Sequence, residues 1–392
     1  MIADLHAHYP MHLVPEARGT AYDLLATAGG RHRLRDRVRA RLIGIAGRFA
    51  NYRSFDSGPR VTIPAMRAGD VGVALSVLYS FFDELDLDQP YGAPPEPGYI
   101  DTLIAQLDLV EADIATNHSD HAGVARDPSQ LDRLLDESKL AVVHCVEGGF
   151  HLGAGPAAVE EAVKRLAGRG VAYITLPHLF WRGVATNAPA LPFLPDRLYR
   201  LLFPQPPVGL SELGRAALRA LVREGLVVDL AHMSARALDD ALALLDQLDP
   251  QRKVPVIASH SAVRLGAQEY NLHAETIERI AERDGVIGLI FARHQLTDGV
   301  RRRRTATFEQ SSEVLAAHID RIADLTGSHR HTAIGSDLDG FIKPTLAGLE
   351  SMADMARLEP MLRTRYGAAD AQLISSGNAL RLLRDHWRGA AP

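Results

Sequence analysis

The sequence is very poor in cysteine: Cys145 is the single thiol among 392 residues. An intrachain disulfide is therefore excluded, and this composition is typical of proteins from a reducing compartment. No apolar run approaches the ~18 residues of a transmembrane helix, and the first residues lack the basic and apolar regions of a signal peptide. We therefore expect a cytoplasmic protein that has no membrane partner.

The sequence also lacks an excess of positive charge. Lysine and arginine number 43 against 48 aspartates and glutamates, a formal net charge of −5. This balance gives no reason to expect a nucleic-acid partner. No G-x-G-x-x-G motif follows a strand-like segment, which weakens the case for a dinucleotide-binding sheet. An apolar fraction of 46% is ordinary for a globular protein, and the length allows one large α/β domain or two smaller ones.

Eight short, apolar, β-branched segments alternate with helical patterns along the chain. They lie at residues 2–9, 71–80, 141–149, 172–180, 226–234, 254–262, 285–293 and 331–341. Buried strands that alternate with helices predict a parallel sheet. Eight such units predict a (β/α)8 TIM barrel, and an open doubly wound sheet is the alternative. We expect a single domain over residues 1–392.

Helices and long connections complete this outline. Ser211, followed by an amphipathic stretch and Gly225, predicts a helix over 211–225, and similar patterns occupy 273–285 and 311–327. An insertion of about 12–70 follows the first strand and contains a predicted surface helix at 31–49. The proline-rich segment 187–210 is expected to be a loop that forms a lid or wall of a pocket. The arginine-rich segment 298–308 reads as a solvated loop or as a site for an anionic substrate.

Ionisable side chains stand at the ends of most of these strands. They are His6, His8, Glu147, His178, His232, His260 and Asp337. The carboxyl ends of the strands in such a barrel meet at one rim, where catalytic groups lie. Any one of these histidines alone would suit a structural role, but seven such groups at one rim are hard to explain by packing. Imidazole and carboxylate together favour zinc or a similar divalent ion.

Several ordered motifs resemble the membrane (renal) dipeptidase family of the amidohydrolase superfamily. They are "VEGG" at 146–149, "YITLPH" at 173–178, "GLSELGRAALRALVREGLVVDLAHMS" at 209–234, "PVIASHS" at 255–261, "AIGSDLDG" at 333–340 and "GNALRLL" at 377–383. The resemblance implies a barrel of the metal-dependent hydrolase type that cleaves the amide bond of a small dipeptide-like substrate through a metal-bound hydroxide. Relatives are often homodimers.

The resemblance also implies a role for each residue. One or two zinc ions would be held by Glu147 as the bridging ligand, by His6 and His8 on one side, and by His232 and His260 on the other. His178 would contact the substrate carbonyl, and Asp337 would handle the proton. A bound metal lowers the pKa of water to about 7, which makes a nucleophile at neutral pH.

Two departures from the family pattern bear on metal and substrate. His8 stands where the family has aspartate, which leaves metal number and identity open. Tyr270 stands where the family has an arginine that holds the dipeptide carboxylate, and Arg264 or the arginines at 301–304 are candidates to replace it. The alternatives are a hydrolase of another small amide, ester or lactone, and a small-molecule-binding relative without catalysis.

Overall fold

The fold is a closed barrel of parallel strands. The computed structural model describes residues 1–14, 58–86, 89–192, 194–301, 304–340, 342 and 344–390. Its strands are β1 (Ile2–Ala7), β2 (Val71–Leu78), β3 (Ala122–Val124), β4 (Leu140–Glu147), β5 (Tyr173–Thr175), β6 (Val227–Asp229), β7 (Val256–Ser261), β8 (Val286–Leu289) and β9 (Thr332–Ile334). They pair in the order β2-β1-β9-β8-β7-β6-β5-β4-β3, and an additional β2–β4 pairing closes the ring. This closure confirms the predicted barrel and rules out the open sheet.

Eight of the nine strands match the predicted segments, and β3 was not predicted. β3 is only three residues long and pairs with the first half of β4, while β5 pairs with the last two residues of β4. The other edge of β4 pairs with β2 from Val73 to Val77 and beyond. β3 is therefore an extra strand beside the ring, and it is too short to give a sequence pattern.

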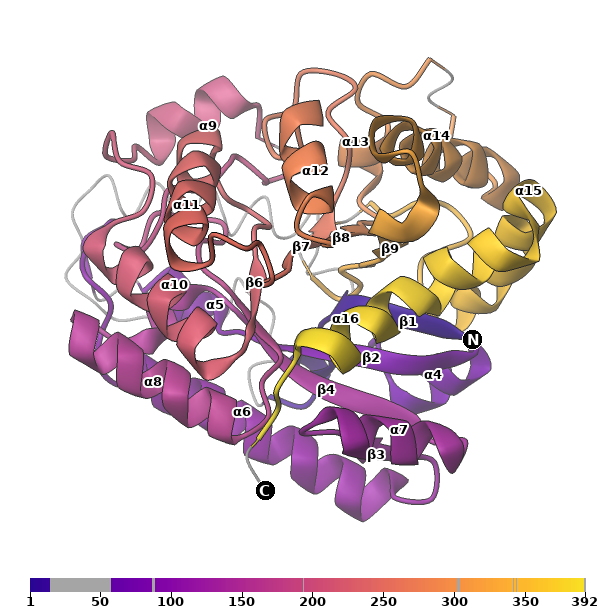
Figure 1. The fold of residues 1–392 in the computed structure, drawn as a ribbon, viewed down its shortest axis with the longest axis horizontal. Helices are drawn as coiled ribbons and strands as arrows, with labels where there is room; N and C mark the ends of the chain where they lie inside the picture. The colour runs from indigo at the N-terminus through magenta and orange to yellow at the C-terminus, as the bar shows by residue number, and fades with distance from the viewer. Residues whose placement is uncertain are drawn as a thin grey trace.

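Helices surround the ring of strands (Figure 1). They are α4 (Ile63–Ala68), α5 (Phe81–Glu84), α6 (Tyr99–Asp113), α7 (Pro128–Asp136), α8 (Pro156–Gly168), α9 (Asp196–Leu202), α10 (Glu212–Glu224), α11 (Ala235–Leu248), α12 (Ala274–Ala281), α13 (Arg293–Leu296), α14 (Phe308–Thr326), α15 (Leu358–Gln372) and α16 (Asn378–His386). No helix in the described part of the chain is both long enough and apolar enough to cross a membrane.

The predicted helices owe their ends to local side-chain and backbone chemistry. At the start of α10 the Ser211 hydroxyl accepts a hydrogen bond from the backbone N–H of Gly214, and the helix ends at Gly225 with a left-handed φ of 75°. α14 begins earlier than predicted, because Thr307 and not Ser311 is its N-cap residue. The predicted helix at 31–49 and most of the insertion lie outside the described residues.

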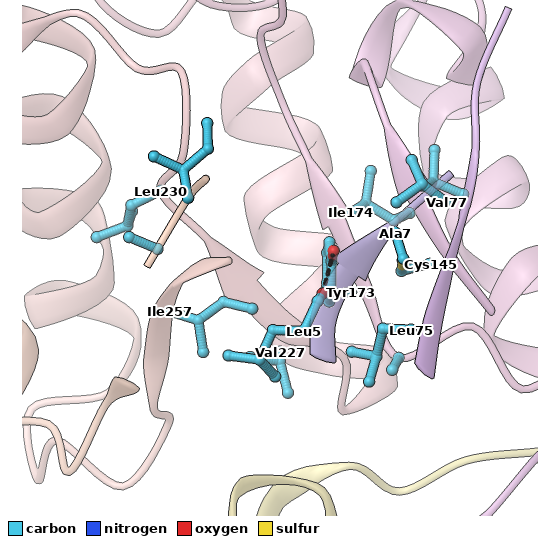
Figure 2. Packing of buried hydrophobic residues seen from close by; sticks show 14 of the residues in the cluster. Leu5, Ala7, Leu75, Val77, Cys145, Tyr173, Ile174, Val227, Leu230 and Ile257 are labelled. Atoms are coloured by element: carbon cyan, nitrogen blue, oxygen red, sulfur yellow. Dashed lines mark hydrogen bonds between the residues drawn. The ribbon is translucent and has the colours of Figure 1, made fainter. Parts of the chain in front are cut away.

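The centre of the barrel is filled by side chains from alternate strand positions. Figure 2 shows Leu5, Leu75, Val227 and Ile257 gathered around Tyr173, and all five are fully or almost fully buried. Burial of a large aliphatic side chain is worth about 1.5–3 kcal/mol. The Tyr173 hydroxyl donates a hydrogen bond to the Leu5 carbonyl, 2.8 Å away. The apolar floor of the barrel therefore gives way to polar groups just beneath the rim.

Two of the predictions about secondary structure need correction. Several strands end earlier than predicted, so that His178, His232 and Asp337 each lie three residues beyond the last strand residue. The segment 187–210, predicted as a loop, contains helix α9. The early ends of these strands have a geometric reason. In a regular strand successive side chains point to opposite faces, whereas these rim residues turn inward from irregular backbone beyond the strand.

Candidate metal centre

The carboxylate of Glu147, at the end of β4, lies at the centre of the polar cluster. Its Oε1 is 3.5 Å from His6 Nε2, 3.2 Å from His232 Nε2 and 3.4 Å from His260 Nε2. Its Oε2 is 3.6 Å from His8 Nε2 and 3.3 Å from His178 Nε2. One carboxylate thus faces five imidazoles that come from the ends of four different strands, because His6 and His8 share the end of β1. The prediction that these residues meet at one rim is confirmed.

Charge explains how this buried carboxylate stays ionised. Burial by itself would raise the pKa of Glu147, but the facing imidazoles of His178 and His6 outweigh burial and hold that pKa well below its usual range. Burial, together with His6 and His232, lowers the pKa of His260 well below its usual range. Burial also lowers the pKa of His232. Neutral imidazole is the form that binds a metal, so the cluster favours the ligand forms of both side chains.

Hydroxyl groups beneath the cluster fix the tautomers of two histidines. Because the Tyr173 hydroxyl donates to the Leu5 carbonyl, it must accept from His6 Nδ1, 2.8 Å away. The Ser259 hydroxyl likewise donates to Asp229 and accepts from His260 Nδ1 at 2.9 Å. Both imidazoles therefore carry hydrogen on Nδ1 and turn Nε2, the nitrogen that a neutral ring leaves bare for a metal, toward Glu147. Such partners orient metal ligands in proteins.

Two buried aspartates hold these groups in place from below. Asp229 accepts from the Ser259 hydroxyl at 2.7 Å and from the backbone N–H groups of Ala231 and Ser259. Asp4 accepts from the backbone N–H of His6 at 3.1 Å and from that of Ser336 at 2.9 Å. Burial is the largest influence on Asp4 and raises its pKa. Asp4 thus joins β1 to the loop after β9, and Asp229 joins the loop after β6 to β7.

His8 and Asp337 form one side of the cluster. Asp337 Oδ1 lies 2.9 Å from His8 Nε2 and 3.8 Å from His6 Nε2. Asp337 has a φ of 57° and His232 a φ of 62°, which are backbone angles that residues other than glycine seldom adopt. Such strain is typical of functional sites, where the surrounding structure holds an unfavourable backbone. Gly340 permits the close approach, because a Cβ there would lie 1.9 Å from Asp337 Oδ1.

His178 forms the opposite side and has a partner of its own. Its Nδ1 lies 2.7 Å from Oε2 of Glu84, a buried residue at the end of α5. Burial opposes the charged imidazolium, but Glu147 and Glu84 together outweigh it and raise the pKa of His178 to about 9. His178 is therefore the imidazole of the cluster that is suited to donate hydrogen bonds from both nitrogens.

The donor atoms fit a divalent metal. Both oxygens of Glu147 and His6 Nε2 are buried without a hydrogen-bond partner, which is costly unless a cation binds them. Three groups of ligand atoms lie within 4.8 Å of one another: His6, Glu147 and His260; His6, His8 and Asp337; and Glu147, His178 and His232. Imidazole nitrogen and carboxylate oxygen are suitable donors for zinc.

The predicted substrate residues Tyr270 and Arg264 are placed differently. Tyr270 is buried at the edge of the cluster, where its ring centroid is 5.0 Å from that of His232, and its hydroxyl donates to the His260 carbonyl at 2.7 Å. The guanidinium of Arg264 contacts its own loop, at His273 Nε2 and the Ala267 carbonyl. Among the described residues no contact joins Arg264 to the cluster. Arg302 and Arg303 lie outside the described residues.

Sequence reasoning missed the residues that support the cluster. Glu84, Tyr173, Ser259 and Asp4 are buried and contact predicted site residues or their backbones. Asp229 is also buried and reaches His260 through Ser259. Asp4 and Asp229 could have been found, because charged residues inside apolar strands are rarely buried without a partner. Glu84 gave no signal, since it stands in the acidic run "FFDELDLD", which reads as a solvated turn.

Comparison with known proteins agrees with this geometry. The model of the membrane dipeptidase family, peptidase family M19, matches residues 34–389. An uncharacterized dipeptidase of Schizosaccharomyces pombe is 28% identical over 325 residues, which cover 81% of this chain and 70% of the relative. The dipeptidase tcpJ of Claviceps purpurea is 27% identical over 71% of this chain, and the match spans 59% of that protein's length.

Solved structures share the fold. A dipeptidase of family M19 superimposes with a TM-score of 0.71 at 18% identity, over 100% of this chain and 99% of the other. A metallopeptidase from Rhodobacter sphaeroides, bound to a phosphinate mimic of the dipeptide L-Ala-D-Ala, gives a TM-score of 0.71 at 19% identity, over 98% of this chain and 99% of the other. With its closed parallel barrel, its cluster of imidazoles around Glu147 and the family match over most of its length, the chain belongs to the membrane dipeptidase family and is a metallo-dipeptidase-like hydrolase.

Proposed function

We propose that this protein hydrolyses the amide bond of a small dipeptide-like substrate at a zinc centre of one or two ions. The observation that carries the proposal is the convergence of His6, His232 and His260 on Glu147 Oε1, at 3.2–3.5 Å. With His8 beside the other oxygen, these five residues would hold the metal. When bound, the metal would supply Lewis acidity, which activates water and polarises the substrate carbonyl.

The chain's own residues supply the remaining steps. His178 faces the cluster through Nε2 and would donate a hydrogen bond to the carbonyl oxygen as negative charge develops there. Asp337 Oδ1, 2.9 Å from His8 Nε2, would accept the proton of the attacking water and pass it to the leaving amine. The buried setting supports both roles, because hydrogen bonds and charges act more strongly where water is excluded.

The proposed substrate is a small dipeptide-like amide. The phosphinate mimic of L-Ala-D-Ala bound by the Rhodobacter sphaeroides protein supports a dipeptide as the substrate class. Tyr270 favours a dipeptide-like amide whose C-terminus is neutral, because its hydroxyl is already committed to the His260 carbonyl and carries no positive charge. The single buried thiol, Cys145, is consistent with work in the cytoplasm.

A direct assay tests this function. Purified protein is stripped with a chelator, reloaded with zinc, and offered a panel of dipeptides together with their C-terminal amides. We expect metal-dependent release of free amino acid that is lost in the double variant His232→Ala, His260→Ala. Hydrolysis that survives full removal of metal, or none with any member of the panel after reloading, would refute the proposal.

A further inference from the structure

Glu84 is a buried acid that stands outside the candidate ligand groups, on the β2 side of the barrel mouth. It is the last residue of α5, and only 2% of its surface is exposed. Acidic side chains are almost never buried to this extent unless they are paired. Neither the family motifs nor the candidate ligand groups include it. Its burial therefore needs an explanation of its own.

Three donors converge on its carboxylate. Oε2 accepts from His178 Nδ1 at 2.7 Å and from the Tyr79 hydroxyl at 2.6 Å. Oε1 accepts from the backbone N–H of Phe180 at 2.8 Å. Together these hydrogen bonds and the imidazolium outweigh burial and lower the pKa of Glu84. The carboxylate thus joins the loop after β2 to the loop after β5, which it contacts at His178 and at Phe180.

The imidazole of His178 is consequently fixed in position and orientation. Its ring meets those of Tyr79 and His232 edge to face, with centroids 4.6 Å away in each case. Since an ionised carboxylate can only accept, Nδ1 must carry hydrogen, and Nε2 is left to face Glu147 Oε2 at 3.3 Å. A ring rotated by 180° would lose the bond to Glu84 and turn carbon toward the cluster.

We propose that Glu84 is a positioning residue, which aims Nε2 of His178 at the reacting carbonyl and keeps a hydrogen on Nδ1. The inference rests on the proposed amide hydrolysis for its kinetic consequence, but the orientation itself does not depend on turnover. A structural clamp that merely joins the two loops is the competing explanation. The two differ in one respect: positioning acts through His178 alone.

A double-mutant cycle distinguishes positioning of His178 from a structural clamp. Glu84→Gln keeps the shape but removes the charge and the obligate acceptor, and we expect kcat to fall about 10- to 100-fold, as for other residues that orient catalytic groups. KM and zinc content should stay near the wild-type values. In the His178→Ala background the same change should cost less than about twofold. Tyr79→Phe, which removes a different donor to the same carboxylate, is the matched control and should cost far less than Glu84→Gln.

A spectroscopic readout keeps the orientation testable without activity. In protein labelled with 15N-histidine, the Nδ1–H resonance absent from His178→Ala identifies His178. We expect Glu84→Gln to shift or abolish this signal and Tyr79→Phe to retain it. Glu84→Asp, which keeps the charge, replaces Glu84→Gln should the latter fail to fold.

The outcomes are distinct. An equal loss of kcat from Glu84→Gln in both backgrounds would show a structural clamp, and an unchanged His178 signal would overturn the orientation. Absence of hydrolysis in the wild type, with a His178 signal that depends on Glu84, would refute the proposed function and leave the positioning intact.

Discussion

Nε2 of His232 lies 2.8 Å from Nε2 of His260, and both are within 3.4 Å of Glu147 Oε1. Ser259 fixes the hydrogen of His260 on Nδ1, so the Nε2 of His260 is a bare acceptor. Without a cation, His232 must supply the hydrogen between the two rings and leave its own Nδ1, which is buried without a partner, as a bare acceptor. A divalent ion held by these side chains would remove this conflict, because both Nε2 atoms could then be bare ligands.

Zinc should therefore stabilise the protein as well as activate it. A ligand at 100 times its Kd adds about 2.7 kcal/mol of unfolding free energy, so the Tm should rise when zinc is added to stripped protein. His232→Ala or His260→Ala should remove at least one ion, as measured by elemental analysis, and should shrink the rise in Tm. The exposed His273, on the loop after β7, provides the control His273→Ala, which should bind zinc normally. Full zinc content in both cluster variants would show that the ligands are elsewhere.

The charge of His178 should be visible in the pH dependence of the stripped protein. Glu147 and Glu84 outweigh burial and raise the pKa of His178 from 6.5 to about 9. A raised pKa contributes stability that is complete below pH 6.5 and is lost as the pH rises through about 9. Chemical unfolding of metal-free protein between these values should show a fall in stability that His178→Gln reduces. The same fall in wild type and variant would assign it to another group.

The ring of strands and the candidate ligands could be predicted from sequence because both leave local patterns. His6, Glu147 and His260 each end an apolar run, and the barrel then brings every such end to one rim. The supporting contacts could not be predicted, since they join residues far apart in the chain. Tyr173 and Leu5 are 168 positions apart, and the pairing of Ser336 with Asp4 spans 332. Only the closed barrel makes these residues neighbours.

The exact ends of the strands could not be predicted from the sequence either. The left-handed backbone at His232 and Asp337 is held by the surrounding loops and not by the residues' own preferences. Propensity reasoning continues a strand through such positions, whereas the structure ends it three residues earlier. Tyr270 illustrates a different limit, because only the structure shows that its hydroxyl is committed to the backbone of His260.

Asp337→Asn should impair turnover without disturbing the fold. Asparagine has the same shape and tolerates a φ of 57°, so the backbone at this position is preserved. The amide cannot accept the proton of water, and kcat should fall by at least ~10²-fold, in line with general acid–base contributions. Zinc content and Tm should change little.

Asp339, two residues on, provides the comparison for Asp337. Its Oδ2 accepts from the backbone N–H groups of Arg60 and Val61, both at 2.8 Å, which is an anchoring role. Asp339→Asn should lower the Tm, whereas its kcat should fall much less than that of Asp337→Asn. The reverse result, with a normal kcat in Asp337→Asn and a large loss in Asp339→Asn, would reassign the proton acceptor.

His8→Asp restores the acid of the family pattern and tests what the imidazole does here. A carboxylate at position 8 would face Asp337 and Glu147, where His8 Nε2 now lies 2.9 Å and 3.6 Å from them. Three buried carboxylates repel one another, so the stripped variant should unfold at lower temperature than the stripped wild type. Zinc offsets the added negative charge, and the rise in Tm on zinc addition should be larger in the variant. An equal or smaller rise would show that position 8 does not contact the metal.

Selection for a free C-terminus should be weak in this protein. A paired hydrogen bond between arginine and a carboxylate is worth about 1.5–3 kcal/mol, and Tyr270 cannot provide it. Comparing kcat/KM for a dipeptide and for its C-terminal amide should therefore show little preference for the acid. Tyr270→Arg should raise that preference by about ten- to a hundredfold if position 270 faces the substrate, whereas Tyr270→Phe, which removes only the bond to the His260 carbonyl, should not.

Because the guanidinium of Arg264 is held by His273 and Ala267, Arg264→Ala should leave the ratio of kcat/KM for acid and amide unchanged. A strong wild-type preference for the free acid that Arg264→Ala abolishes would instead show that this loop moves to bind the carboxylate, and would make Arg264 the anchor that Tyr270 is not.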